Sequence, residues 1–212
     1  MTATTLWLIR HGETAWNAIG RMQGHTDIPL NETGLEQADL LGRQLQKDNA
    51  QAHFAALYVS DLARARQTAQ PGSHAIGLAM ELDPQLRERN YGIYEGLTRE
   101  QIAEQYPEGF AHIKARTPDY QIPEGESLVQ FSARTLDVLG RLANKHPDQQ
   151  ILVVAHGGIL DCAYRAATGI GLEVPRGHAL LNASINRLSF EDGHFRLLSW
   201  GDVAHLDPGI LE

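Results

Sequence analysis

The sequence predicts an α/β protein, a three-layer α/β/α sandwich with a mostly parallel central sheet and an antiparallel strand toward the C-terminus. Two observations support this prediction. Short apolar runs alternate with stretches of helical periodicity, which is the order of elements that builds a parallel sheet covered by helices. Near the C-terminus, residues 184–190 and 194–200 flank Glu191-Asp192-Gly193, a turn sequence typical of a β-hairpin.

Three apolar runs are the predicted parallel strands. The first, residues 6–9, stops abruptly at Arg10, His11 and Gly12. The others are residues 55–59 and 151–155, and the last is apolar throughout, as expected of a central strand covered on both faces. Open α/β sheets bind ligands beyond the carboxyl ends of their strands, so the polar residues that follow these runs are candidate site residues.

Helix-start signals divide the rest of the chain. Thr33 with Glu36 forms a capping box before a helix that we expect to end near residue 47, and Ser127 with Gln130 forms another. Further helical stretches follow two of the strands. These are residues 62–69, which come after a cap signal at Ser60-Asp61, and residues 158–167.

The remaining segments are predicted from their glycines and prolines. Residues 13–30 and 82–97 have no clear period and are predicted to be loops. Two short helices interrupted by prolines are expected at about 98–125, as a small helical insertion or lid on one domain that spans residues 1–212.

Composition limits the possible partners. A net charge of −8 over 212 residues argues against nucleic acid, because nucleic-acid-binding domains usually carry basic excess. No apolar run approaches the length of a membrane span, and the N-terminus lacks a secretory pattern. The single cysteine, Cys162, cannot form an internal disulfide. We therefore expect a cytoplasmic protein with a small-molecule substrate and no nucleic-acid or membrane partner, and the oligomeric state is left open.

The three predicted strand ends carry related side chains. Arg10 and His11 follow the first strand, Arg64 lies just after the second, and His156 and Gly157 follow the third. If the strands are parallel neighbours, two histidines and two arginines meet at one edge of the sheet. Arginine's planar fork matches phosphate oxygens, and the N–H of a glycine that opens a helix adds a further donor. The pattern therefore predicts a site for a phosphoryl group.

These strand ends and the loop before the insertion contain four recognisable motifs. They are Arg10-His11-Gly12-Glu13-Thr14 with Trp16-Asn17, then Ser60-Asp61-Leu62 with Arg64 and Gln67-Thr68-Ala69, then Leu86 with Glu88 and Tyr91-Gly92, and last Val154-Ala155-His156-Gly157-Gly158. In type, order and separation they resemble the motifs of the histidine phosphatase, or phosphoglycerate mutase-like, superfamily. The resemblance covers most of the chain.

The resemblance implies a role for each matching residue. His11 would be the nucleophile that forms a phosphohistidine, and Glu88 would protonate the leaving oxygen and later activate water. The residues implied to hold the phosphoryl group are Arg10, Arg64 and His156, and those implied to bind substrate are Asn17, Gln23, Gly24, Tyr91 and Gly157. Because two arginines and a second imidazole would stabilise the transferring charge, no metal and no cofactor are expected.

The resemblance leaves the reaction open between hydrolysis and mutase chemistry. The family's phosphoglycerate mutases have a longer insertion, in which an adjacent pair of arginines binds a second anionic group of the substrate. Here residues 89–126 are compact and contain no adjacent pair of cations. This favours a phosphomonoester hydrolase for small metabolites of the phosphosugar, phosphoglycerate-derivative, phosphoserine or α-ribazole-phosphate type.

Two other readings remain. One is a cofactor-dependent phosphoglycerate mutase, which would require 2,3-bisphosphoglycerate as phosphoryl donor. The other is a non-catalytic module that binds a phosphorylated ligand. The cations Lys114 and Arg116 in the insertion belong either to a solvated helix face or to a substrate clamp.

Overall fold

The computed structural model describes residues 3–210, so residues 1–2 and 211–212 of the predicted domain lie outside the described residues. One six-stranded sheet has the order β3-β2-β4-β1-β5-β6. Its strands are β1 (Thr4–Arg10), β2 (Ala56–Val59), β3 (Met80–Leu82), β4 (Gln150–Ala155), β5 (Ile185–Glu191) and β6 (His194–Asp202). The first four pair in parallel, β5 runs antiparallel to β1, and β6 runs antiparallel to β5. The predicted mixed sheet is confirmed.

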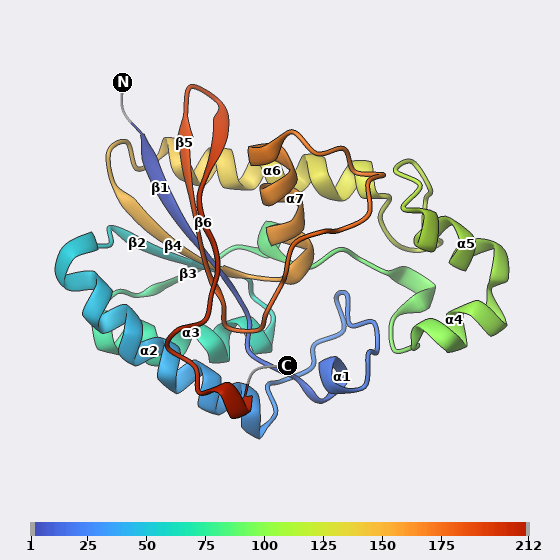
Figure 1. Cartoon of the computed structure of the whole chain (residues 1–212), viewed down its shortest axis with the longest axis horizontal. Coiled ribbons are helices and arrows are strands. Elements are labelled where there is room, and N and C mark those ends of the chain that lie inside the picture. The colour runs from blue at the N-terminus through green and yellow to red at the C-terminus, as the bar shows by residue number, and fades with distance from the viewer. Residues whose placement is uncertain (1–2, 211–212) are drawn as a thin grey trace.

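Helices cover both faces of the sheet (Figure 1). Successive side chains of a strand point to opposite faces, so Leu6 and Leu8 pack with one core, and Trp7 and Ile9 with another. The helices of the first core are α6 (Leu128–Asn144) and α7 (Gly157–Thr168), and those of the second are α2 (Glu32–Ala52) and α3 (Ala63–Ile76). The protein is therefore an α/β/α sandwich, as predicted.

The register of the three central strands brings their carboxyl ends to one edge. Arg10 is the β1 partner of Ala155, and Val59 of β2 is the partner of Val154. The residues after each strand, including His11 and Ser60, therefore lie side by side. This alignment is the basis of the candidate site.

Two predicted helix starts are wrong and one is confirmed. Ser127 caps α6, with its side chain accepting from the Gln130 N–H. By contrast, α2 is capped by Asn31, two residues before the predicted Thr33, and it continues to Ala52. Ser60 does not cap α3, whose cap residue Leu62 makes no side-chain hydrogen bond. The Ser60 hydroxyl instead contacts His156 in the site described below.

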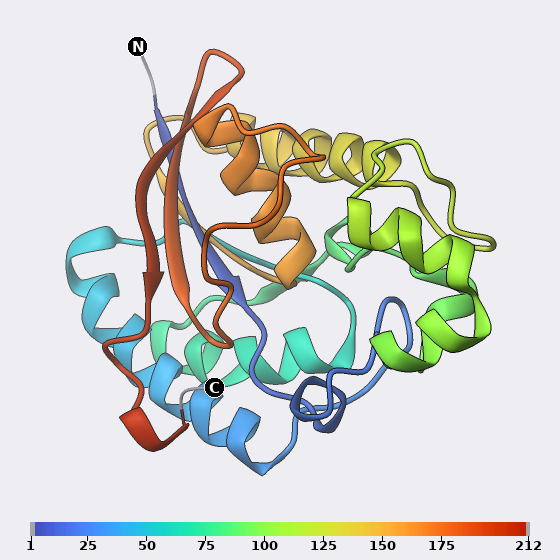
Figure 2. The same ribbon diagram turned by 45° about the vertical axis from the view of Figure 1, so that its right-hand side comes forward.

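The segment at 98–125 contains the two expected helices, α4 (Arg99–Gln105) and α5 (Pro107–Ala115). They lie to one side of the sandwich (Figure 2). Their own small core includes Tyr94, Ile102 and Ile122. The predicted loops contain further short elements: α1 (Ala15–Ala18) and the 3₁₀ turns Pro84–Leu86 and Gly92–Tyr94, with a last turn at Pro208–Ile210. No helix within residues 3–210 is both long enough and apolar enough to span a membrane.

Candidate active site

His11 is fixed directly beyond the end of β1. Its backbone N–H donates to the Ala155 carbonyl at 2.9 Å, and its own carbonyl accepts from Asn182 Nδ2 at 2.9 Å. Its ring Nδ1 lies 2.7 Å from the carbonyl oxygen of Gly12. Since a carbonyl oxygen can only accept, Nδ1 carries the proton and Nε2 carries the lone pair. This is the tautomer that a nucleophilic histidine needs.

The His11 imidazole is held neutral. The side chain is buried, and burial lowers its pKa well below the usual value, with the positive charges of Arg64 and Arg10 lowering it further. A protonated ring could not attack an electrophile, so the surroundings of His11 favour its nucleophilic form.

Arg64 is a fully buried cation at the same edge of the sheet. It donates to the carbonyl oxygens of Thr26 at 3.0 Å and Gly24 at 2.8 Å, and its Nε donates to His156 Nδ1 at 3.3 Å. Within residues 3–210 it forms no ion pair with an acidic side chain. A buried guanidinium whose charge is not neutralised is a strong attractor for an anion.

The ring of His156 lies next to His11, with 5.1 Å between the two ring centroids. Its Nδ1 accepts from Arg64, so its Nε2 carries the proton and donates to Ser60 Oγ at 2.8 Å. Burial, followed by the charge of Arg64, lowers its pKa well below the usual value. His156 thus orients Arg64 with both ring nitrogens already bonded, and its predicted contact with a phosphoryl group stays a prediction.

Arg10 contributes a second cation beside His11. Its guanidinium donates to the Leu180 carbonyl, while its Nε is buried without a partner within residues 3–210. Burial lowers its pKa to about 10, which leaves it charged at neutral pH. It also forms no ion pair with an acidic side chain in the described part of the chain. Arg10 therefore keeps one N–H, on Nε, without a hydrogen-bond partner in the described residues.

Glu88 is held at the same edge by two backbone donors. Oε2 accepts from the Gly158 N–H at 3.0 Å and Oε1 accepts from the Arg89 N–H at 2.8 Å. A Cβ on Gly158 would lie 2.1 Å from Oε1, so this close approach requires glycine at position 158. The N-terminus of α7 therefore fixes the candidate proton donor.

All of these residues except His156 line a cavity of about 300 Å³, a volume typical of small-molecule sites. Its wall is formed by Arg10, His11, Asn17, Arg21, Met22, Gln23, Gly24, Arg64, Glu88, Tyr91, Arg99, Gly157, Gly158, Arg176, His178 and Leu180. Every predicted site residue except His156 is among them. Five arginines face a single carboxylate, so the cavity is cationic in a protein with a net charge of −8.

The predicted substrate-binding residues offer donors and one acceptor. Asn17 Oδ1 accepts from the Thr14 N–H at 3.2 Å, which leaves the amide NH₂ for a ligand. Gly157 is the first residue of α7, so its N–H has no acceptor within the helix. Burial raises the pKa of Tyr91 to about 12, which keeps the phenol protonated. Gln23 Oε1 is buried without a partner in the described residues.

Glu95 organises the substrate side of the cavity and was not predicted from the sequence. Its carboxylate accepts from the His25 N–H at 2.8 Å, from the Thr26 N–H at 2.9 Å and hydroxyl at 2.7 Å, and from the Tyr91 N–H at 3.2 Å. It also lies where a Cβ on Gly24 would be, 2.0 Å from its Oε1. Glu95 thus ties the loop that carries Gln23 to the loop that carries Tyr91.

Further lining residues were also missed, among them Arg21, Arg99, Arg176 and His178. The signal for the last two was available, because an antiparallel strand next to β1 must begin at the edge where β1 ends, and Ile185 of β5 is the partner of Ile9. Residues just before β5 therefore had to approach His11. The sequence left open whether Lys114 and Arg116 of the insertion contact substrate, and neither lines the cavity. Lys114 is exposed, and Arg116 pairs with Asp161 at 2.9 Å.

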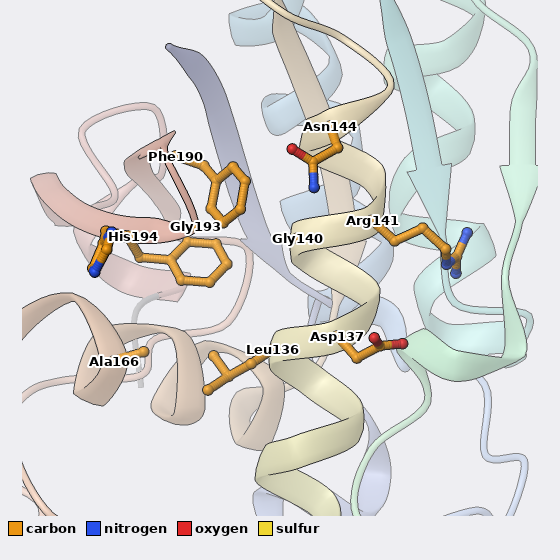
Figure 3. Close-up of a pocket in the computed structure, with 10 residues that line it drawn as sticks. Leu136, Asp137, Gly140, Arg141, Asn144, Ala166, Phe190, Gly193 and His194 are labelled. Atoms are coloured by element: carbon orange, nitrogen blue, oxygen red, sulfur yellow. The ribbon is translucent and has the colours of Figure 1, made fainter. Parts of the chain in front are cut away.

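A larger hollow of about 660 Å³ lies elsewhere, between α6, α7 and the β5–β6 hairpin (Figure 3). Phe190 and Phe195 line it, with Asp137, Arg141 and His194. None of the predicted site residues is among its lining residues. The smaller cationic cavity is therefore the candidate active site. Within residues 3–210, no three His, Cys, Asp or Glu side chains are grouped to hold a metal ion.

Comparison with known proteins identifies relatives over nearly the whole chain. A metal-independent phosphoserine phosphatase of Arabidopsis thaliana is 38% identical over 212 residues, covering 99% of this chain and 86% of the relative. A probable phosphoglycerate mutase, GpmB, of Yersinia pestis (strain Pestoides F) is 32% identical, covering 98% and 97%. The solved structure of Bacillus stearothermophilus YhfR matches with a TM-score of 0.86 at 32% identity, covering 95% and 98%.

The relatives are thus named both for a phosphatase and for a mutase. Residues 6–203 match the histidine phosphatase superfamily, branch 1, which is more than nine-tenths of the chain. This chain belongs to the histidine phosphatase superfamily.

Proposed function

We propose that this protein is a metal-independent phosphomonoester hydrolase that acts on small phosphorylated metabolites through a phosphohistidine intermediate. The observation that carries the proposal is the neutral, buried His11 imidazole, with its proton on Nδ1 and its Nε2 free of partners within residues 3–210. It lines a cavity whose wall also holds Arg10 and Arg64, two cations that form no ion pair with an acidic side chain of residues 3–210. A phosphate dianion would supply the missing negative charge.

In the proposed first step, His11 Nε2 attacks phosphorus in line with the ester bond. The N–P bond forms as the P–O bond breaks, and the protonated carboxyl of Glu88 gives its proton to the leaving alcohol oxygen. Arg10 and Arg64 stabilise the charge on the equatorial oxygens, aided by the Gly157 N–H. The product alcohol leaves and His11 carries the phosphoryl group.

In the second step, water attacks the same phosphorus from the side that the alcohol has vacated. The Glu88 carboxylate takes the proton from water as the P–O bond forms and the N–P bond breaks. Phosphate is released, and both side chains return to their starting protonation states. Because the arginines supply the positive charge, the proposal requires no metal ion or cofactor, and the Arabidopsis relative is named metal-independent.

The proposal takes residues 1–212 as one histidine phosphatase-like domain, in which the helical segment 98–125 forms a lid over the cavity. Arg99, the first residue of α4, supports this view because it lines the cavity. The free and buried Cys162 is in keeping with a reducing compartment, and we propose a cytoplasmic location and a small phosphomonoester as the binding partner.

A phosphoglycerate mutase is the second candidate. Arg21, Arg99 and Arg176 also line the cavity, so additional cations come from three separate segments and not from an adjacent pair in the insertion. The GpmB relative favours the same alternative. A mutase would use 2,3-bisphosphoglycerate as phosphoryl donor and would return the phosphoryl group to a bound intermediate. A non-catalytic binding module is the third and weakest candidate, because the residues proposed as nucleophile and proton donor, His11 and Glu88, both line the cavity.

A panel of phosphomonoesters, assayed in parallel for phosphate release and for isomerisation of 2- and 3-phosphoglycerate, separates these candidates. The proposal predicts that phosphate release is the faster reaction and survives EDTA. Isomerisation that outpaces phosphate release would identify a mutase, and complete loss of activity in EDTA that a single metal restores would overturn the metal-free mechanism. If the protein releases no phosphate and is not itself labelled by any activated ester, the non-catalytic binding module is the remaining candidate.

A further inference from the structure

Arg176 lies on the segment between α7 and β5, and this segment is anchored at several points. The carbonyl oxygen of Ala179 accepts from Trp200 Nε1 at 2.8 Å, and that of Leu180 accepts from the Arg10 guanidinium. The ring of His178 stacks on Tyr164 with centroids 3.8 Å apart. The segment therefore forms a fixed wall of the cavity.

The carboxylate of Asp161, a residue of α7, holds the Arg176 side chain. Oδ1 lies 3.3 Å from Arg176 Nε, while Oδ2 is shared by Arg116 at 2.9 Å and by Arg165 at 3.1 Å. His178 Nε2 lies 3.0 Å from Oδ1 but outside hydrogen-bond geometry, and burial lowers the His178 pKa, which favours the neutral ring. One carboxylate thus faces three guanidinium groups, and the cluster keeps a net positive charge.

Arg176 is the member of this cluster that can reach a ligand. Its side chain is 42% exposed, against 17% for Arg116 and 2% for Arg165, and it alone of the three lines the cavity. Its hydrogen bond to Asp161 uses Nε, and its two terminal nitrogens form no hydrogen bond within residues 3–210. That end of a guanidinium binds a carboxylate through two parallel hydrogen bonds.

We propose that Arg176 is a specificity-determining residue that binds a carboxylate on the substrate while Arg10 and Arg64 hold the phosphoryl group. The inference rests on the proposed function, because it assumes that Arg10 and Arg64 bind the phosphoryl group. Arg176 and Arg10 line the same cavity of about 300 Å³, and the charge of Arg176 acts on the pKa of Arg10. A small metabolite can therefore span both cations.

The test is a binding comparison that needs no turnover. In a His11→Ala background, calorimetry gives the Kd of 3-phosphoglycerate and of glycerol 3-phosphate, which has a CH₂OH group in place of the carboxylate. Adding Arg176→Ala should weaken 3-phosphoglycerate binding about tenfold, equivalent to about 1.4 kcal/mol, and change glycerol 3-phosphate binding less than about twofold. Arg176→Lys, which keeps the charge but not the fork, should recover part of the loss.

Arg141→Ala is the matched control. Arg141 is 43% exposed and also pairs with one aspartate, Asp83, but it lies on α6 and does not line this cavity. It should leave both affinities unchanged. Equal weakening of the two ligands by Arg176→Ala, or no weakening, would overturn the subsite, as would failure of both ligands to bind. If the selective loss is seen but the wild-type protein never releases phosphate, the subsite stands and the proposed hydrolysis fails.

Discussion

Nδ1 of His11 lies 2.7 Å from the carbonyl oxygen of Gly12, the next residue in the chain. This one contact fixes the ring tautomer, because only a protonated nitrogen can face a carbonyl oxygen at that distance. The lone pair is thereby assigned to Nε2. Burial and two neighbouring arginines then keep the ring neutral. Tautomer and protonation state are both those that attack on phosphorus requires.

The neutral histidines predict how stability depends on pH. His11 and His156 have pKa values well below their unfolded value of about 6.5, so the unfolded chain binds more protons below that pH. Their stabilising effect is complete above pH 6.5 and declines as the pH falls. Each should contribute a slope of up to about 1.4 kcal/mol per pH unit.

Urea unfolding of wild type and His11→Ala between pH 7 and 5 checks this prediction. The variant lacks one of the two histidines, so its free energy of unfolding should fall less steeply, by up to about 1.4 kcal/mol per pH unit. Comparison of the two proteins cancels the contributions of other titrating groups. Parallel curves for the two proteins would mean that folding does not lower the pKa of His11, and would contradict this prediction.

Replacement of the proton donor should show a leaving-group dependence. Glu88→Gln removes the acid, so hydrolysis of alkyl phosphates should fall by about 10²–10⁴-fold, the usual contribution of general acid catalysis. Nitrophenyl phosphate should lose much less in the phosphorylation step, because nitrophenolate departs without a proton. Burst-phase rates for the two ester classes make the comparison, and equal losses would point to another acid.

Gly158→Ala tests the position of Glu88 without changing its chemistry. The added Cβ would lie 2.1 Å from Glu88 Oε1 and 2.8 Å from Phe131, so the carboxylate must move. We expect at least about a tenfold loss of kcat for alkyl phosphates, by the sensitivity of catalysis to displaced groups. Gly140→Ala in α6 is the control, since its Cβ would meet nothing closer than 3.5 Å. Full activity of the Gly158 variant would contradict the assignment of Glu88.

Removing the Glu95 carboxylate should loosen the substrate side of the cavity. Glu95→Ala leaves backbone donors of His25, Thr26 and Tyr91 without their acceptor. The free energy of unfolding should fall by about 2–3 kcal/mol, and KM should rise more than kcat falls. Glu104→Ala, at an exposed position of α4, should do neither. An unchanged denaturation midpoint for Glu95→Ala would refute this role.

Most of the fold follows from periodicity in the sequence. The apolar runs at β1, β2 and β4 could be predicted because buried parallel strands are apolar on both faces. Strand β3 was not predicted, because Met80–Leu82 is only three residues long and its Glu81 and Leu82 side chains are exposed. The start of α2 was misplaced because Asn31 and Thr33 are both good cap residues, and only tertiary packing decides between them.

The sequence could predict that residues following strands lie together, but it could not predict contacts that are set by loops. His11, Arg64 and His156 meet because three parallel strands end together. Glu95 has no sequence signal, since its role depends on backbone N–H groups about 70 residues away. Arg176 was predictable in principle from the antiparallel direction of β5, which was itself part of the sequence prediction.

Trapping the covalent intermediate tests the central claim most directly. Wild-type protein is mixed briefly with a phosphate-labelled ester, quenched in base, and digested for mass spectrometry. We predict a phosphoryl group on His11 that is stable in base and lost in acid, and no label in a folded His11→Ala variant. Label on another residue, or turnover that persists undiminished in His11→Ala, would contradict the account.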